Sequence, residues 1–315
     1  MLRLVPDDTK IPFMGWRRVT FAVSVVLMTI SLALWAISGI NFGIDFTGGN
    51  LIEVRHKGGP ADIAAVRSTI GKLDLGEAQV QGFGQPDDVM IRLPQQEGGD
   101  AAQQVALAKV KDALGDTYEI RRTEVVGPSV SADLRRDGAI AVAVSLFLVL
   151  VYLWFRFEWQ FAVGAVLTTV HDVLLTMGVI IAFQLQFDLQ SLAAVLTIVG
   201  YSLNDTVVIY DRIRENLRKY KKMPLAELID LSINQTLSRT IATTLTTFLA
   251  VLALFVFGGE ALRGFNFTML VGIIIGTYSS IVVSAPLLIF LNLRTGGGES
   301  AASDKAAPVA SKAKA

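Results

Sequence analysis

An aspartate lies inside an apolar stretch of this chain. In "VGYSLNDTVVIYDRIREN", Asp205 precedes the first arginine, Arg212, by seven residues. At a rise of about 1.5 Å per residue, the carboxyl lies on the order of 10 Å inside an apolar helix. Because a charge is costly in the hydrocarbon layer, such an aspartate usually faces a bundle interior or a water-filled cavity and serves a function. A structural, hydrogen-bonding aspartate is the alternative.

Polar residues accompany Asp205 at helical spacing. Tyr201 and Ser202 lie four and three residues before it, and Asn204 lies beside it. A second apolar stretch, "TLSRTIATTLTT", has Arg239 near its start and threonines at helical spacing. These hydroxyls could hold water and carry protons, or they could simply bond helix to helix. The threonines are Thr236, Thr240, Thr243, Thr244 and Thr247.

A second carboxylate lies in "TTVHDVLLT". Asp172 stands four residues from both Thr168 and Thr176, with His171 adjacent, so one face of this helix is polar near mid-membrane. His171 is either a packing residue or a proton carrier. In the last apolar stretch, small residues recur at every fourth position, and we expect this stripe to let a neighbouring helix pack closely. Its members are Gly272, Gly276, Ser280 and Ser284.

These residue types suggest a proton site. Burial favours the neutral form of Asp205, whereas the approach of Arg239 favours the charged form. Protonation would then be coupled to relative movement of the two helices. A potential of 100 mV acting on one charge supplies about 2.3 kcal/mol to such a change. The candidate proton-coupling residues are Asp205, Arg239, Asp172 and Asn204.

The composition excludes several kinds of site. Cysteine is absent and only two histidines are present, so disulfides, thiolate chemistry and a zinc site are not expected. No glycine-rich phosphate-binding loop of the G-x-x-x-x-G-K-[ST] type occurs. The 28 basic and 28 acidic residues balance, which indicates no attraction to nucleic acid. We therefore expect no metal and no nucleotide hydrolysis by this chain, and the function preferred below is non-enzymatic and needs no cofactor.

Six apolar helices must position the candidate residues. The hydrophobic content of 52% and the mean hydropathy of +0.51 indicate a membrane protein. About 20 apolar residues cross a bilayer as a helix. The expected spans are 19–38, 138–155, 161–183, 189–210, 240–257 and 267–291. The first span is longer than the apolar core of a usual signal peptide, which is its alternative interpretation.

The basic residues predict the orientation. Arg17, Arg18 and Arg156 flank the first three spans on one side, while the turns on the other side hold only Arg263. Because basic loops stay in the cytoplasm, both termini should be cytoplasmic and the segment after the first span periplasmic. Between the fourth and fifth spans lie Arg212, Arg214, Arg218, Lys219, Lys221 and Lys222.

A soluble domain interrupts the first two spans. Its pattern reads strand, helix, strand, strand, helix, strand, with a turn at "QPDD" (85–88), which is a ferredoxin-like α+β arrangement. The polar, low-complexity tail predicts disorder. The expected organisation is a cytoplasmic N-terminus at 1–18, the first transmembrane helix at 19–38, the periplasmic domain at 39–131, transmembrane helices 2–6 at 132–293 and the cytoplasmic tail at 294–315.

Four motifs in order resemble one family. They are "FGIDFTGGN", "HD", "GYSLNDTVVIYDRIREN" and "SRTIATTLTT". Over about residues 41–293 the chain resembles the SecF proteins of the SecD/SecF family, in the RND superfamily. The matched motif residues are Gly43, Asp45, Phe46, Gly48, Gly49, Gly200, Ser202, Asp211 and Arg212. The segment 42–49 could also form a rigid joint between the first span and the domain, since glycines permit unusual backbone angles.

The resemblance implies a role in protein export at the bacterial cytoplasmic (inner) membrane. Such proteins pair with SecD, associate with the SecYEG channel and YajC, and use the proton-motive force to promote preprotein translocation after initiation by SecA. It also implies that Asp205 and Arg239 take part in proton passage. Since this chain has one bundle rather than two, a SecD partner would supply the other half. Whether the coupling ion is a proton or sodium stays open.

Two other functions remain as alternatives. The chain could be half of an RND-type proton antiporter for small solutes, although such exporters usually carry larger external domains. It could also be a scaffold of the translocon that conducts no ions. We further expect the outer surface of the soluble domain to contact preprotein or an external domain of SecD.

Overall fold

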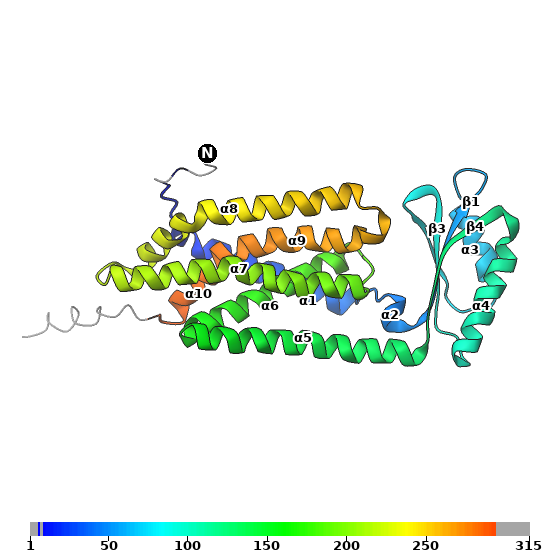
Figure 1. The fold of residues 1–315 in the computed structure, drawn as a ribbon, viewed down its shortest axis with the longest axis horizontal. Coiled ribbons are helices and arrows are strands. Elements are labelled where there is room, and N and C mark those ends of the chain that lie inside the picture. Colours follow the sequence, from blue (N-terminus) through cyan, green and yellow to red (C-terminus); the bar gives the residue numbers. More distant parts are fainter. Residues whose placement is uncertain (1–5, 7–8, 294–315) are drawn as a thin grey trace, which may run out of the picture.

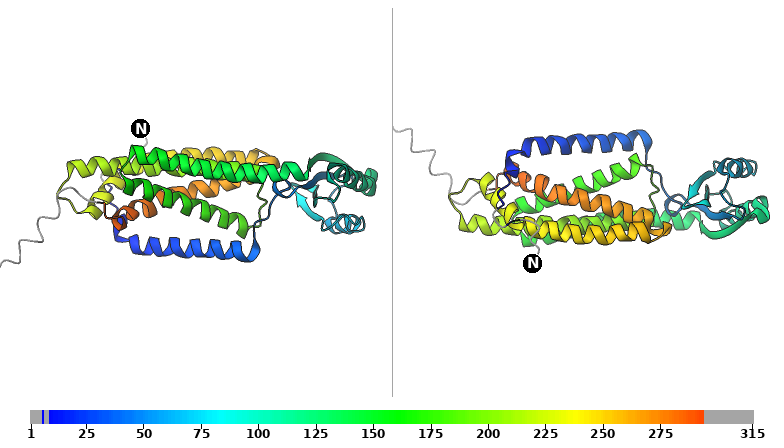
Figure 2. Two further views of the ribbon diagram at one scale, coloured as in Figure 1. Left: turned by 90° about the horizontal axis from the view of Figure 1, so that it is seen from below. Right: turned by 90° about the horizontal axis from the view of Figure 1, so that it is seen from above.

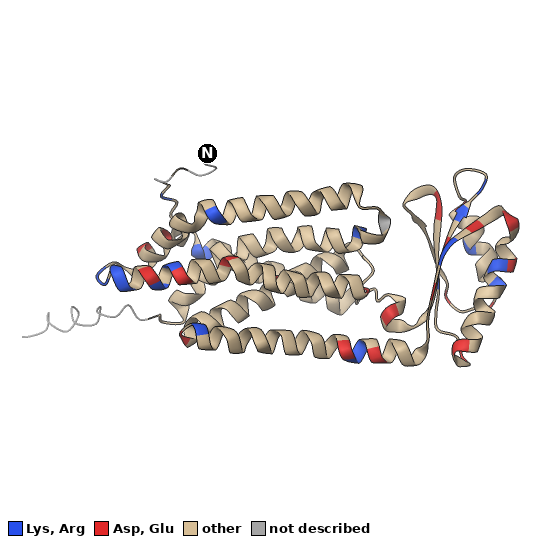
Figure 3. Cartoon of the chain, in the orientation of Figure 1, with Lys and Arg blue, Asp and Glu red and all other residues tan. Residues whose placement is uncertain are grey.

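The computed structural model describes residue 6 and residues 9–293. The predicted disordered tail, 294–315, and residues 1–5 lie outside the described residues. Figure 1 shows a long helical bundle with a small α+β domain at one end. Charged residues are concentrated in that domain and toward the ends of the bundle, and the middle of the helices is largely free of them (Figure 3).

Six segments within the described residues are long and apolar enough to cross a membrane. They are α1 (Arg17–Ser38), α5 (Pro128–Arg156), α6 (Trp159–Ala182), α7 (Leu189–Lys219), α8 (Leu225–Phe257) and a last span, Arg263–Phe290. The last span consists of α9 (Arg263–Ser279), a π-helical turn (Ser280–Ser284) and α10 (Ala285–Phe290). A proline, Pro286, lies in the first turn of α10 and cannot donate a backbone hydrogen bond, which accounts for irregular helix just before it.

Local sequence explains where several helices begin and end. Asp188 caps α7, because its carboxyl accepts a hydrogen bond from the backbone N–H of Ser191 at 2.8 Å. Pro128 opens α5, where its missing N–H costs nothing. Gly39, with a φ of 66°, ends α1.

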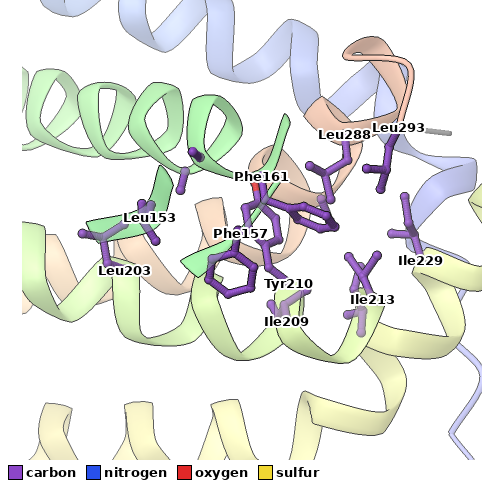
Figure 4. Packing of buried hydrophobic residues seen from close by; sticks show 14 of the residues in the cluster. Leu153, Phe157, Phe161, Leu203, Ile209, Tyr210, Ile213, Ile229, Leu288 and Leu293 are labelled. Atoms are coloured by element: carbon purple, nitrogen blue, oxygen red, sulfur yellow. The ribbon is translucent and has the colours of Figure 1, made fainter. Parts of the chain in front are cut away.

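Three spans form the centre of the bundle. In an apolar 18-residue stretch of each span, the share of buried residues is 56% for α6, 50% for α7 and 50% for the last span. The corresponding share is 6% for each of α1, α5 and α8. Figure 2 shows α1 and α5 on opposite sides of the central helices. In the core around Tyr210, aromatic and aliphatic side chains pack closely (Figure 4). The Tyr210 hydroxyl donates to the backbone oxygen of Ser284 at 3.0 Å and thereby ties α7 to the last span.

The small domain, here called the outer domain, has the predicted order of elements. They are β1 (Gly49–His56), α3 (Ile63–Gly71), β2 (Gln79–Phe83), β3 (Gln85–Leu93), α4 (Gly99–Leu114), a 3₁₀ turn (Gly115–Thr117) and β4 (Tyr118–Val126). The antiparallel sheet has the order β2-β3-β1-β4. This is the ferredoxin-like topology, so the predicted fold class is confirmed. The core lies between the sheet and the two helices.

One local prediction is wrong. The residues "QPDD" form the start of β3, and the hairpin turns instead at Gly84, which has a φ of 71°. A tight turn needs this left-handed conformation, which glycine adopts without strain. Asp88 continues the strand because its partner across the sheet is Arg55, whose guanidinium donates two hydrogen bonds of 2.7 Å to the carboxyl.

Candidate functional site

Asp172 on α6 joins three helices. Its side chain is only 1% exposed. Oδ2 accepts hydrogen bonds from the hydroxyl of Ser202 on α7 and, at 2.7 Å, from that of Ser279 on α9. Oδ1 lies 2.8 Å from Nδ1 of His171. Because a buried carboxyl is costly unless it is bonded, these contacts make Asp172 a fixed centre of the bundle.

His171 keeps one ring nitrogen without a bond. Nε2 of His171 is buried and has no hydrogen-bond partner among the described residues. The ring is therefore oriented by Asp172 at one nitrogen and free to accept or donate at the other. Its role as a packing residue or a proton carrier remains a prediction.

The stripe of small residues on the last span explains how Ser202 and Ser279 meet Asp172. A Cβ added at Gly276 would lie 3.2 Å from Cβ of Ser202, and one at Gly272 would collide with Ile198. Glycine at both positions lets α9 approach α7 closely. The close packing predicted for this stripe is confirmed by these contacts.

Asp205 lies one helical turn beyond Ser202, but it is held differently. Its side chain is 4% exposed, and Oδ2 has no hydrogen-bond partner among the residues that the structure describes. From α8, Arg239 lies close enough to act on this carboxyl electrostatically, and Thr243 lies beside it. Among the described residues, no ion pair within 4.0 Å joins Arg239 to Asp205. The two predicted partners are thus neighbours that are not locked together.

Several buried hydroxyls near the two carboxyls also lack a partner in the described part of the chain. They come from α6, α7 and α8 and are Thr176, Tyr201, Thr206 and Thr240. Buried polar groups of this kind are normally satisfied by ordered water or by a partner group. We call Asp172, Asp205 and these hydroxyls the polar interior. Such an arrangement can hold water and pass a proton between carboxyl groups. Within residues 9–293, no three His, Asp or Glu side chains gather as metal ligands would.

Asn204 points away from the polar interior. It lies on the exposed face of α7, as does Gly200, where an added Cβ would meet no other heavy atom within 4 Å. Its predicted part in proton coupling therefore does not rest on contact within this chain and stays a prediction.

Asp211 and Arg212 lie at the end of the bundle opposite the outer domain. Asp211 forms an ion pair with Arg156 at 3.0 Å, and Arg212 donates to Gln235 at 2.7 Å. These contacts connect α7 to α5 and α8. The two residues therefore fix helix ends and do not contact the polar interior.

The "FGIDFTGG" residues also lie apart from the polar interior, at the joint between bundle and outer domain. Phe46 stacks on Phe187 of the turn between α6 and α7, with ring centroids 5.7 Å apart. Gly48 and Gly49 have φ values of 74° and 122°, and a Cβ at Gly49 would collide with the backbone oxygen of Leu93. Both glycines are thus required by the backbone geometry.

Sequence reasoning missed Ser279. It neighbours the small-residue stripe but was not part of it, and it meets Asp172 across 107 residues of chain. The only signal was a polar residue in an apolar helix. A partner on another helix could not be identified from spacing.

Family models match most of the chain. One described as "Protein export membrane protein SecD/SecF, C-terminal" matches residues 106–294, and one described as "SecD/SecF GG Motif" matches residues 33–55. The protein translocase subunit SecF of Pseudomonas aeruginosa is 47% identical over 283 residues, which cover 90% of this chain and 92% of that one. The subunit SecDF of Brucella abortus is 47% identical over 293 residues, which cover 93% of this chain.

Two solved structures are also similar to this chain, and both are structures of SecDF. The crystal structure of SecDF from Thermus thermophilus superposes with a TM-score of 0.83 at 36% identity and covers 92% of this chain. A structure of SecDF in a super-membrane-facing form gives a TM-score of 0.67 at the same identity. The chain spans only 39% of the Brucella SecDF and 40% of each solved SecDF chain.

Proposed function

This chain belongs to the SecD/SecF family of protein export membrane proteins, and on that premise we propose that it is an auxiliary subunit of the Sec translocase. With SecD, it uses the proton-motive force to promote preprotein translocation after SecA has driven initiation. The observation that carries the proposal is Asp205, a buried carboxyl with an unpartnered oxygen and an arginine nearby that is not ion-paired with it.

Proton coupling follows from how Asp205 is held. Burial favours its neutral form, and Arg239 favours its charged form. When α8 brings Arg239 closer, Asp205 releases a proton, and when the two separate, Asp205 takes one up. Protonation is thereby linked to the relative position of α7 and α8. Ser202, one turn before Asp205 on α7, donates a hydrogen bond to Asp172 of α6. Asp172 is therefore the next carboxyl along a proton route.

SecD is the partner that this model requires. Small or polar residues line an exposed face of α7 at helical spacing, and in lipid such a face favours packing against another helix. A SecD bundle on this face would contact Asn204 and give it the role beside Asp205 that the motif suggests. The exposed residues are Ala193, Thr197, Gly200 and Asn204.

The membrane orientation is part of the same proposal. Basic residues gather where α7 ends and α8 begins, at the end of the bundle opposite the outer domain. By the positive-inside rule, that end and both termini are cytoplasmic, and the outer domain is periplasmic. From there it can meet an emerging preprotein near SecYEG and YajC.

The deciding experiment replaces Asp205 in the intact complex. Membrane vesicles containing SecD and the Asp205→Asn variant should lose proton flux and show at least about tenfold slower export, because the variant cannot release a proton. The matched control is Asp137→Asn, which changes an exposed aspartate on α5. Complex abundance is measured in both.

Each other outcome points to a different function. Normal export at normal abundance with Asp205→Asn supports a scaffold and contradicts proton coupling. Solute transport by the reconstituted protein, without an export defect on deletion, supports a small-solute antiporter. Applying a sodium gradient in place of the pH gradient identifies the coupling ion.

A further inference from the structure

The segment Asn41–Gly49, here called the clamp, holds the first turn of α7. We propose that Asp45 is a positioning residue: through the clamp it ties the outer domain to the helix that carries Asp205. This inference rests on the proposed function for its mechanical meaning. The contacts that carry it lie at the joint between α1, β1 and the turn that joins α6 to α7.

Backbone bonds fasten the clamp to that turn. The N–H of Gly43 donates to the oxygen of Phe187 at 2.8 Å, and the N–H of Phe187 donates to the oxygen of Asn41 at 2.8 Å. Side-chain Nδ2 of Asn41 donates to the oxygen of Gln184 at 3.1 Å. Two segments more than 140 residues apart in sequence are therefore paired as in a short parallel sheet.

Asp45 extends this pairing into α7 itself. Its Oδ2 accepts a hydrogen bond from the N–H of Leu189, the first residue of α7, at 3.0 Å. Asp188 caps the same turn through Ser191. Free N–H groups and the positive end of the helix dipole favour carboxylates at this position. One of the two caps of α7 thus comes from a distant segment.

Side-chain packing makes the joint stiff. Phe46 is buried in a cluster with Ile180 of α6 and Val195 of α7. The Phe46 backbone oxygen accepts a hydrogen bond from Arg135 of α5. A Cβ at Gly43 would lie 3.2 Å from Cβ of Asp188 and 3.3 Å from the backbone oxygen of Phe187, so an added side chain would crowd the paired turn.

The other end of the clamp continues into the sheet. Gly49 begins β1, which pairs with both β3 and β4 in the middle of the sheet. Arg92 of β3 also donates to Oδ1 of Asn41 at 3.3 Å. A displacement of the outer domain therefore acts on Leu189, from which Asp205 lies about 24 Å along the same helix. The first turn of α7 is therefore a point at which force on the outer domain reaches the bundle in addition to the direct chain connections to α1 and α5.

Replacing Asp45 in the full complex tests the inference with two readouts. In Asp45→Ala, amide hydrogen exchange over residues 187–195 should become about tenfold faster, as expected for a lost cap. Export should fall at least about fivefold at unchanged complex abundance, while ion flux that depends on Asp205 continues. Asp45→Asn retains an oxygen acceptor and should restore most of both readouts.

A matched control separates positioning from the loss of a helix cap in general. Asp62 caps α3 in the outer domain by accepting from the N–H of Ala65 at 3.0 Å, far from the bundle. Asp62→Ala should leave export and exchange at residues 187–195 unchanged. Gly43→Ala should reproduce the defect of Asp45→Ala, whereas Gly264→Ala, where an added Cβ meets nothing within 4 Å, should not.

The opposite results overturn the inference. Unchanged exchange in Asp45→Ala shows that the carboxyl does not hold the first turn. Faster exchange with export at the normal rate shows that the clamp does not transmit force. Failure of the proposed function is seen separately, as normal ion flux and export in Asp205→Asn, and the exchange result for Asp45 would stand beside it.

Discussion

Asp172 and Asp205 are both buried, but their surroundings differ. Asp172 is bonded to His171, Ser202 and Ser279, whereas Asp205 keeps an oxygen without a partner among the described residues. A buried carboxyl with several hydrogen bonds favours one arrangement of helices, and an incompletely bonded carboxyl can exchange partners. Burial alone therefore does not distinguish a carboxyl that is held by several hydrogen bonds from one whose partners can change. The number of partners does.

The outer domain also contains one carboxyl that is held by a partner and one that is affected mainly by burial. Hydrogen bonds from Arg55 hold the pKa of Asp88 below its ordinary value. Burial raises the pKa of Glu53, although the charge of Arg122, 3.7 Å away, opposes this. One carboxyl is stabilised in its charged form by a partner, and the other is destabilised by loss of water. Both lie in the same sheet.

The largest expected effect is a difference in stability between variants of the two carboxyls in the bundle. Asp172→Ala leaves the Ser202 hydroxyl and a histidine nitrogen without a partner, at about 1–3 kcal/mol for each buried group, while Ser279 keeps its hydrogen bond to the backbone oxygen of Gly276. Asp205→Ala removes a carboxyl with few bonds and should change unfolding by less than about 1 kcal/mol. Thermal unfolding of the purified chain in detergent measures both. Equal losses would show that the two carboxyls are held alike.

A smaller difference in stability is expected between glycine variants on a buried face and on an exposed face of the central helices. Gly272→Ala forces a Cβ against Ile198 and should cost about 1–3 kcal/mol of stability. Gly200→Ala meets no neighbour in this chain and should leave its stability within about 0.5 kcal/mol. The same variant should weaken co-purification with SecD if that partner covers the face. Unimpaired co-purification would count against this interface.

The dependence of outer-domain stability on pH tests the partnered carboxyl. Since the folded pKa of Asp88 is depressed, its contribution is present above the unfolded value and is lost as pH falls below about 4. Asp88→Asn should therefore lower the unfolding midpoint at neutral pH and reduce its fall in acid. Urea unfolding of the full chain measures this effect when it is carried out from neutral to acidic pH and monitored by amide hydrogen exchange in β3. Parallel pH curves for variant and wild type would contradict the assignment.

Glu53 should give the smallest effect, with the opposite sign. Because its folded pKa is raised, its favourable contribution is complete below the unfolded value and disappears as pH rises through the folded one. Glu53→Gln should therefore unfold slightly later than wild type at neutral pH, and the difference should vanish in acid. A variant that is less stable at neutral pH would show that the attraction to Arg122 outweighs burial.

The sequence predicted most of the fold because apolar length and strand alternation are local patterns. Six spans, the order of elements in the outer domain and the position of Asp205 inside a helix all followed from such patterns. The turn at Gly84 was misplaced, since the pairing of Asp88 with Arg55 involves another strand. The interior role of Asn204 also did not appear within this chain, because the rotation of α7 depends on its neighbours.

By itself, the sequence determined that carboxyls lie within apolar helices, because composition and helical rise are properties of one segment. Tertiary structure alone decided which carboxyl is bonded. Ser279 reaches Asp172 from a helix 107 residues away, and Asp45 reaches the first residue of α7 across 144 residues. Hydrogen bonds require two groups within about 3 Å, and only the packing of distant helices sets that distance.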